Sequence, residues 1–217
     1  MMKQILNPKF KYIDNLLWPA YDTKLLAVNH LVSDLDMILK FVDNKKVVVQ
    51  AGGACGIWPK ELSNHFNTVY TFEPDSVNFT CMCHNIGQNH PNIIRIQAAL
   101  GNKHKLIGMN QTDYPQNAGA QYVDFKINGV IPTLKIDNLG LDILGLIMLD
   151  IEGMEYFAIR GATKTIAKCR PIIVVEEKPL KHMDKLNVRT KDAHHLILDM
   201  GYRLISKIHK DNIYAPV

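Results

Sequence analysis

The hydrophobic positions of the chain follow two periodicities in turn, and their succession predicts an α/β domain. Short runs rich in Val, Ile and Leu are typical of buried parallel strands. Between them, apolar residues recur at three- and four-residue steps, as on one face of a helix. The predicted strands are 46–50, 68–72, 93–99, 144–149 and 171–175. The predicted helices between these strands are about 57–66, 75–85, 154–167 and 190–200.

Both ends of the chain depart from this succession. Apolar residues at helical steps through 24–42 predict an amphipathic helix, so we expect 1–45 to form a helical extension. Near the other end, 202–208 and 213–215 flank a short turn and predict an antiparallel hairpin. We therefore expect 1–217 to form a single domain with a doubly wound sheet of seven strands, the last one antiparallel. This arrangement is typical of methyltransferases that use S-adenosylmethionine (AdoMet).

The segment 102–133 interrupts the alternation of strands and helices. It is polar, carries Gly108, Pro115, Gly119 and Gly129, and includes one predicted strand at 121–127. Long irregular segments inside a compact domain usually serve a function. We predict that it forms a lid or small hairpin near the ligand pocket of the domain. The side chains of Tyr114, Gln116 and Asn117 are expected to reach this pocket.

A glycine-rich turn follows the first predicted strand. Its glycines are Gly52, Gly53 and Gly56. A dinucleotide fingerprint, G-x-G-x-x-G, would need glycines where Ala54 and Ile57 stand. The spacing found is the looser G-x-x-x-G, which indicates an AdoMet pocket; a tight turn without a ligand is the alternative interpretation.

Two positions after the next strands are candidates for contacts with the nucleoside. Glu73 ends the second predicted strand, about 20 residues after the glycine turn, where a carboxylate can accept hydrogen bonds from both ribose hydroxyls. The alternative for Glu73 is a helix N-terminal acid beside Asp75. Ala98 and Ala99 follow the third strand and are expected to flank the adenine.

Carboxylates gather after the fourth and fifth predicted strands. Asp150, Glu152 and Glu155 follow one strand, and Glu176 follows the other. Ligands of open α/β sheets bind at this edge. We expect Asp150 to hold the cofactor ammonium or a substrate hydroxyl, Glu152 or Glu176 to act as a base, and Glu155 to cap a helix. A magnesium or calcium ion bound by these acids is the alternative. We favour no metal, because the positive charges of AdoMet can balance the acids.

Other candidate sites in the sequence are weaker. Cys81 and Cys83 resemble zinc ligands, but on a helix their side chains point to nearly opposite sides. His182, His194 and His195 are candidate bases by residue type alone.

Composition limits the location and the partners of the protein. The four cysteines form no spaced framework, and no apolar run approaches the length of a membrane span. We therefore expect a cytoplasmic protein without a membrane partner. The net charge of +4 is a weak hint of an anionic partner such as nucleic acid.

Three blocks of sequence between Val47 and Lys178 resemble the FkbM-type AdoMet-dependent methyltransferases. The turn VQAGGACG at 49–56 is similar to the V-D-V-G-A-N-x-G turn of that family. The stretch YTFEP at 70–74, with asparagines downstream, resembles its second block. The third and most specific block is LDIEGME at 149–155, followed by RGA at 160–162 and by 171–176.

The resemblance implies transfer of the AdoMet methyl group to a hydroxyl, often on a sugar or another small molecule. Gln50 and Ala54 stand where the family has Asp and Asn. A nucleic-acid or protein methyltransferase and a non-catalytic AdoMet-binding protein are the alternatives. The expected catalytic residues are Asp150, Glu152 and Glu176. The residues expected to bind the cofactor are Gln50, Gly52, Gly53, Ala54, Gly56, Trp58, Glu73, Pro74, Ala98 and Asp150.

Overall fold

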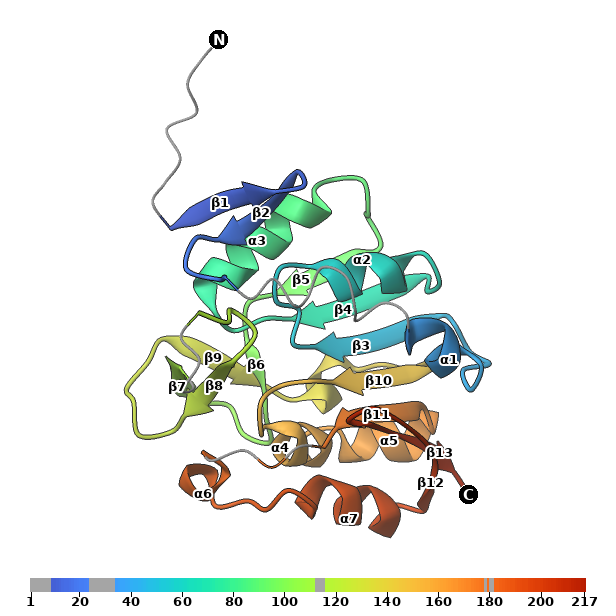
Figure 1. Ribbon diagram of the computed structural model, residues 1–217. Coiled ribbons are helices and arrows are strands. Elements are labelled where there is room, and N and C mark those ends of the chain that lie inside the picture. Colours follow the sequence, from blue (N-terminus) through green and yellow to red (C-terminus); the bar gives the residue numbers. More distant parts are fainter. Residues whose placement is uncertain (1–8, 24–33, 112–115, 178, 180–181) are drawn as a thin grey trace.

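A sheet of seven strands runs through the middle of the molecule, with helices on both faces (Figure 1). The structure is a computed structural model and describes residues 9–23, 34–111, 116–177, 179 and 182–217. The strand order is β12-β13-β11-β10-β3-β4-β5. β13, the last strand, is antiparallel to both of its neighbours, whereas the strands from β11 to β5 are parallel. The prediction of a doubly wound α/β fold is confirmed.

The elements of this layer follow the predicted succession closely. The strands are β3 (Val47–Ala51), β4 (Thr68–Phe72), β5 (Ile93–Ile96), β10 (Leu146–Leu149), β11 (Ile172–Glu176), β12 (Tyr202–Ile208) and β13 (Asp211–Pro216). The helices are α1 (Leu35–Leu39), α2 (Ile57–Ser63), α3 (Ser76–Ile86), α4 (Glu155–Arg160), α5 (Thr163–Cys169), α6 (Met183–Leu186) and α7 (Asp192–Asp199), with a 3-10 turn at Ile136–Leu139.

Strand β10 explains why the central strands are continuously apolar. Leu146 and Met148 pack into one core with α1, α2 and α3, whereas Ile147 and Leu149 pack into the other with α4, α5 and α7. Successive side chains of a strand point to opposite faces, so a strand covered on both faces must be apolar at every position. The first polar residues after β10 therefore lie at the edge of the sheet.

The predicted helix 154–167 is two helices, α4 and α5, and they are separated at Gly161. A Cβ atom on Gly161 would lie 2.1 Å from the carbonyl oxygen of Gly101. This close approach of two backbones requires a glycine, and it comes from a residue about 60 positions away in the sequence. The helical periodicity of the segment could not reveal the break.

The amino-terminal extension is a β-hairpin over part of its length, and the helical prediction is wrong for 10–19. β1 (Phe10–Ile13) pairs antiparallel with β2 (Leu16–Pro19). Asp14 and Asn15 connect them with φ angles of 48° and 67°, as a two-residue hairpin turn requires. Most of the predicted helix 24–42 lies outside the described residues; α1 occupies its described end.

The segment 102–133 belongs to a second, four-stranded sheet of order β6-β9-β7-β8. β7 (Leu106–Gln111) and β8 (Gln121–Asp124) form an antiparallel hairpin, while β6 (Ala99–Leu100) pairs with β9 (Ile131–Leu134). We call 102–133 the insertion. It lies beside the carboxyl ends of β3, β4 and β10 (Figure 1). Across the described part of the chain, no helix is long and apolar enough to cross a membrane.

Candidate active site

A cavity opens where the carboxyl ends of the central strands meet the insertion. It contains about 940 Å³ of space free of protein atoms, part of it open solvent. Its walls are the turn after β3, the residues that follow β4, β5 and β10, and the inner end of the β7–β8 hairpin. Eight of the ten residues predicted to bind the cofactor line it: Gly52, Gly53, Ala54, Trp58, Glu73, Pro74, Ala98 and Asp150.

Gln50 and Gly56 support the cavity from outside its lining. The Gln50 side chain is buried; its Nε2 donates to the Gly52 carbonyl at 2.9 Å, and its Oε1 accepts from the Thr71 hydroxyl at 2.6 Å. Gln50 therefore stabilises the glycine turn through hydrogen bonds. Gly56 precedes α2 with a φ of 92°, a left-handed conformation that favours glycine.

Glu73 connects the glycine turn to the start of α3. Its Oε2 accepts from the Ala54 amide at 2.7 Å, and its Oε1 accepts from the Asp75 amide at 2.8 Å. The side chain is 5% exposed, and burial raises the pKa of the carboxyl to about 7. A carboxylate has about four lone-pair sites, so these two amides leave it able to accept from another donor. Glu73 also lines the cavity, so it can accept hydrogen bonds from a ribose diol there.

Replacing Glu73 by Ala should weaken the binding of S-adenosylhomocysteine (AdoHcy) by about 1.5–3 kcal/mol, the usual contribution of hydrogen bonds to a charged group. Isothermal titration calorimetry measures this loss. The free energy of unfolding should fall as well, because two partly buried amides lose their acceptor. Glu61→Ala, on α2 and outside the cavity, is the matched control. A folded Glu73→Ala protein with unchanged affinity for AdoHcy would exclude the ribose contact.

Asn78, which sequence reasoning did not assign to the site, lines the cavity beside Glu73. Its Nδ2 donates to the carbonyl of Ala118 in the insertion at 2.9 Å. The residue is 2% exposed, and its Oδ1 has no hydrogen-bond partner in the described part of the chain. A buried acceptor without a donor costs free energy, which a donor on a bound ligand would offset. The cavity thus offers unused acceptors, as the hydroxyls and amino groups of AdoMet require.

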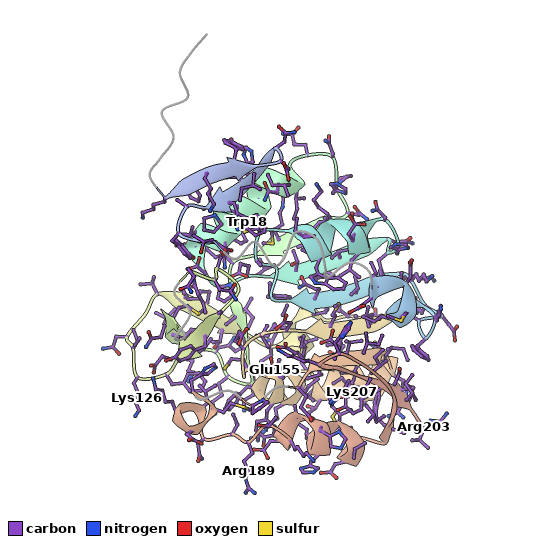
Figure 2. The ribbon with its side chains drawn as sticks, viewed as in Figure 1. Trp18, Lys126, Glu155, Arg189, Arg203 and Lys207 are labelled. Carbon is purple, nitrogen blue, oxygen red and sulfur yellow. The ribbon has the colours of Figure 1, made fainter. Side chains whose placement is uncertain are left out.

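The amino-terminal segment is hydrogen-bonded to the part of the insertion that lines the cavity, a contact that sequence reasoning missed. Trp18 is buried, and its Nε1 donates to Asp22 Oδ2 at 2.9 Å (Figure 2). The same oxygen accepts from the Ala118 amide at 3.4 Å. Gln121, which lines the cavity, donates from Nε2 to the Tyr21 hydroxyl at 2.8 Å. Ala118 and its neighbour Gly119 line the cavity; Gln116 and Asn117 do not, and Tyr114 lies outside the described residues.

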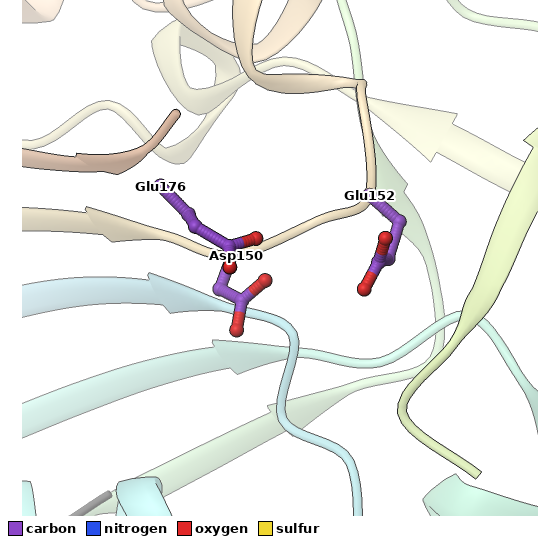
Figure 3. Close-up of side chains that lie close together, drawn as sticks. All are labelled: Asp150, Glu152 and Glu176. Atoms are coloured by element: carbon purple, nitrogen blue, oxygen red, sulfur yellow. The ribbon is translucent and has the colours of Figure 1, made fainter. Parts of the chain in front are cut away.

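The three predicted catalytic carboxylates lie together at one end of the site (Figure 3). Asp150 and Glu152 follow β10 and line the cavity, whereas Glu176 ends β11 and lines a smaller neighbouring cavity. One oxygen from each of the three lies within 4.8 Å of the others. This set of oxygens can face the positive charge of a cofactor, take up a proton, or hold a divalent cation.

Glu155 is the first residue of α4 (Figure 2). Its Oε1 accepts from the Ile151 amide at 2.9 Å, and so closes the turn that carries Asp150 and Glu152. Burial raises the pKa of the Glu155 carboxyl to about 7, and the nearby negative charges of Asp150 and Glu152 add to the effect.

The buried carboxyl of Glu155 predicts a pH-dependent stability. Its folded pKa lies above the unfolded value, so its contribution to stability is complete below about pH 4.5 and is lost as the pH rises through about 7. Glu155→Gln keeps an oxygen for the Ile151 amide and removes the titration. The variant should match the wild type near pH 4.5 and be more stable by about 2–3 kcal/mol at pH 8, as measured by urea unfolding. Equal stability at pH 8 would contradict the buried charge.

The seven-stranded sheet with its reversed last strand, and a ligand cavity at its carboxyl edge, define the Rossmann-like methyltransferase fold. Residues 60–204 match the model of the methyltransferase FkbM domain, and the chain belongs to this family. Membership implies AdoMet as the cofactor, and the unused acceptors and carboxylates around the cavity fit it. No curated protein sequence matches the chain.

Solved structures show the same fold at low sequence identity. The methyltransferase FkbM of Methylobacillus flagellatus KT is 19% identical with a TM-score of 0.56; the match covers 82% of this chain and 45% of that one. The chain thus matches less than half of the length of that relative. An rRNA methylase of Streptococcus thermophilus is 10% identical with a TM-score of 0.50, and the match covers 85% of this chain and 95% of that one.

Proposed function

We propose that the protein is an AdoMet-dependent methyltransferase that acts on a hydroxyl group of a small molecule or sugar. The observation that carries the proposal is the position of Asp150 and Glu152, which line the same cavity as the glycine turn and Glu73. When bound, AdoMet supplies a methyl group on a positively charged sulfur. The residues of the chain then have to bind the two reactants, align them and accept one proton.

The residues around the cavity have different roles in this proposal. Glu73 accepts hydrogen bonds from the ribose, and Asn78 Oδ1 accepts one from another donor of the cofactor. Asp150 balances the ammonium charge. Glu152 takes the proton of the acceptor hydroxyl onto a carboxylate oxygen, with Glu176 as a second candidate base. Such proton transfer typically contributes about 10²–10⁴-fold to a rate.

The insertion has the task of excluding water from the reactants. Alignment and exclusion of solvent supply much of the rate of a two-substrate displacement. Two hydrogen bonds, from Asn78 to the Ala118 carbonyl and from Gln121 to the Tyr21 hydroxyl, hold the insertion against the rest of the protein. We propose that the insertion covers the cofactor and the acceptor as a lid.

A melting experiment tests the choice of cofactor. AdoHcy should raise the midpoint of thermal unfolding, because a ligand selective for the folded state stabilises it, by about 2.7 kcal/mol at a concentration 100 times the Kd. NAD should leave the midpoint unchanged. A shift with NAD and none with AdoHcy would reverse the assignment made from the glycine spacing.

Turnover tests the reaction itself. The protein is incubated with methyl-labelled AdoMet and a library of hydroxylated compounds that includes sugars. The proposal predicts transfer of label to at least one compound of the library. AdoHcy binding without any transfer would favour a non-catalytic AdoMet-binding protein. Transfer to RNA or protein only, with binding to RNA that weakens steeply with salt, would favour the macromolecular alternative.

A further inference from the structure

The turn that carries Glu152 has an unusual backbone conformation. Glu152 adopts a φ of 52°, and Gly153, the next residue, has a φ of 98°. For a residue with a Cβ atom, the left-handed region is unfavourable by roughly 1–2 kcal/mol. Such a conformation persists only where neighbouring groups hold it. In this conformation, one carboxylate oxygen of Glu152 lies within 4.8 Å of an oxygen of Asp150 and of Glu176.

His182 supplies one contact that holds the turn. Its Nε2 lies 2.7 Å from the carbonyl oxygen of Glu152. A carbonyl oxygen can only accept, so Nε2 carries a hydrogen and donates it. The side chain is 6% exposed and stands immediately before α6. A hydrogen bond in so buried a place fixes the peptide of Glu152 from one side.

The histidine ring is itself held in place by the insertion. Tyr122, on β8, stacks on it with 3.9 Å between ring centroids and 11° between the ring planes. The Tyr122 hydroxyl accepts from Lys185 Nζ at 2.9 Å, on the same short helix that His182 precedes. The ring therefore has a fixed orientation, which β8 and the segment around α6 set together. The hydrogen bond between Tyr122 and Lys185 joins these two segments across 63 residues of sequence.

We propose that His182 is a positioning residue that holds Glu152 in its left-handed conformation and so places the Glu152 carboxylate beside Asp150 and Glu176. The inference rests on the proposed role of Glu152 as a base. We do not propose His182 as the base, because it is not among the described residues that line the main cavity. Stacking on Tyr122 also makes the position of Glu152 depend on the insertion.

Hydrogen exchange tests the positioning without a methyl acceptor. The amides of Ile151 and Met154 are hydrogen-bonded within the turn and report on its opening. In His182→Ala they should exchange about 10-fold faster, as expected for loss of one buried hydrogen bond. His182→Gln retains an N–H donor and should restore slow exchange. His195→Ala, an exposed histidine on α7, is the matched control and should change nothing.

Kinetics with labelled AdoMet, and the library compound that the wild type methylates, separate positioning from general stability. His182→Ala should lower kcat on the order of 10²-fold, while the KM for AdoMet and the Kd of AdoHcy change less than about threefold. His182→Gln should recover most of kcat. Unchanged exchange and kcat in His182→Ala would overturn the inference. Equal losses of melting temperature, AdoHcy affinity and rate, without rescue by Gln, would also overturn it, because they indicate a structural role only.

The failure of this inference can be told apart from the failure of the proposed function. If Glu152→Gln loses activity and His182→Ala does not, Glu152 remains the base and His182 does not position it. If Glu152→Gln keeps full activity, the base assignment fails, and the positioning of Glu152 for catalysis fails with it.

Discussion

Replacing Glu152 by Gln should lower kcat for methyl transfer by about 10²–10⁴-fold, the usual contribution of a general base. The amide keeps the size of the side chain but cannot take up the proton of the acceptor hydroxyl. The affinity for AdoHcy should change little, because Glu73 and the glycine turn make the contacts proposed for the cofactor. Labelled AdoMet with the methylated library compound measures kcat, and calorimetry with AdoHcy measures affinity.

Two further experiments, a second variant and a chelator, are needed to interpret the result for Glu152→Gln. Asp150→Asn should weaken AdoHcy binding more than it lowers kcat, because Asp150 is proposed to balance the ammonium charge. A chelator tests the divalent cation that the three carboxylates could hold. If a chelator abolishes turnover and magnesium or calcium restores it, the three carboxylates form a metal site and Glu152 is not a general base. Chelator-resistant, full activity in both Glu152→Gln and Glu176→Gln would leave catalysis to alignment alone.

Replacing Gly52 by Ala should lower the free energy of unfolding by about 2–5 kcal/mol, which combines left-handed backbone strain with a steric clash. Gly52 has a φ of 87°, and a Cβ atom there would lie 2.0 Å from the carbonyl oxygen of Asp150. Because a backbone atom cannot swing aside as a side chain can, β3 and β10 would have to separate at their carboxyl ends. Urea unfolding measures the loss.

Gly140→Ala is the matched control for Gly52→Ala. Gly140 also has a left-handed φ, of 63°, but a Cβ atom there would meet nothing within 4 Å. It should lose only the conformational part, about 1–2 kcal/mol. Equal losses in the two variants would show that the approach of Gly52 to Asp150 is not the constraint on this turn.

The spacing of the glycines predicted the turn at Gly52 correctly but gave only part of the reason for a glycine there. The spacing of the glycines predicts a turn in which a ligand approaches the backbone. In the structure the residue nearest to a Cβ on Gly52 is Asp150, which directly follows the neighbouring strand β10. The glycine thus allows two strand ends to meet, and this contact brings the glycine turn and the acid cluster into one cavity.

Local signals predicted the central layer well. The strand 68–72 was predicted with the bounds that β4 has, because a run of β-branched and aromatic residues is a local signal for a strand. The helix predicted at 75–85 corresponds to α3, and the carboxylate of Asp75 caps it by accepting from the amides of Val77 and Asn78. The acids after β10 and β11 could be expected together, because parallel strands end at one edge.

Contacts between distant segments could not be predicted from the same signals. The break at Gly161 depends on the backbone of Gly101. The β1–β2 hairpin did leave a local signal, Asp14-Asn15, but its two strands of four residues are too short to show a clear alternation. The hydrogen bond from the Asn78 side chain to Ala118 and the stacking of His182 on Tyr122 join segments at least 40 residues apart, so only the folded chain reveals them.

A crystal structure of the protein grown with AdoHcy tests the proposed site most directly. The ribose should lie against Glu73, the methionine part along the turn of Gly52 to Ala54, and the sulfur should face the end of the cavity that Asp150 and Glu152 line. The insertion should cover the ligand. AdoHcy bound at another place, or bound with its sulfur turned away from Asp150 and Glu152, would contradict the proposed active site.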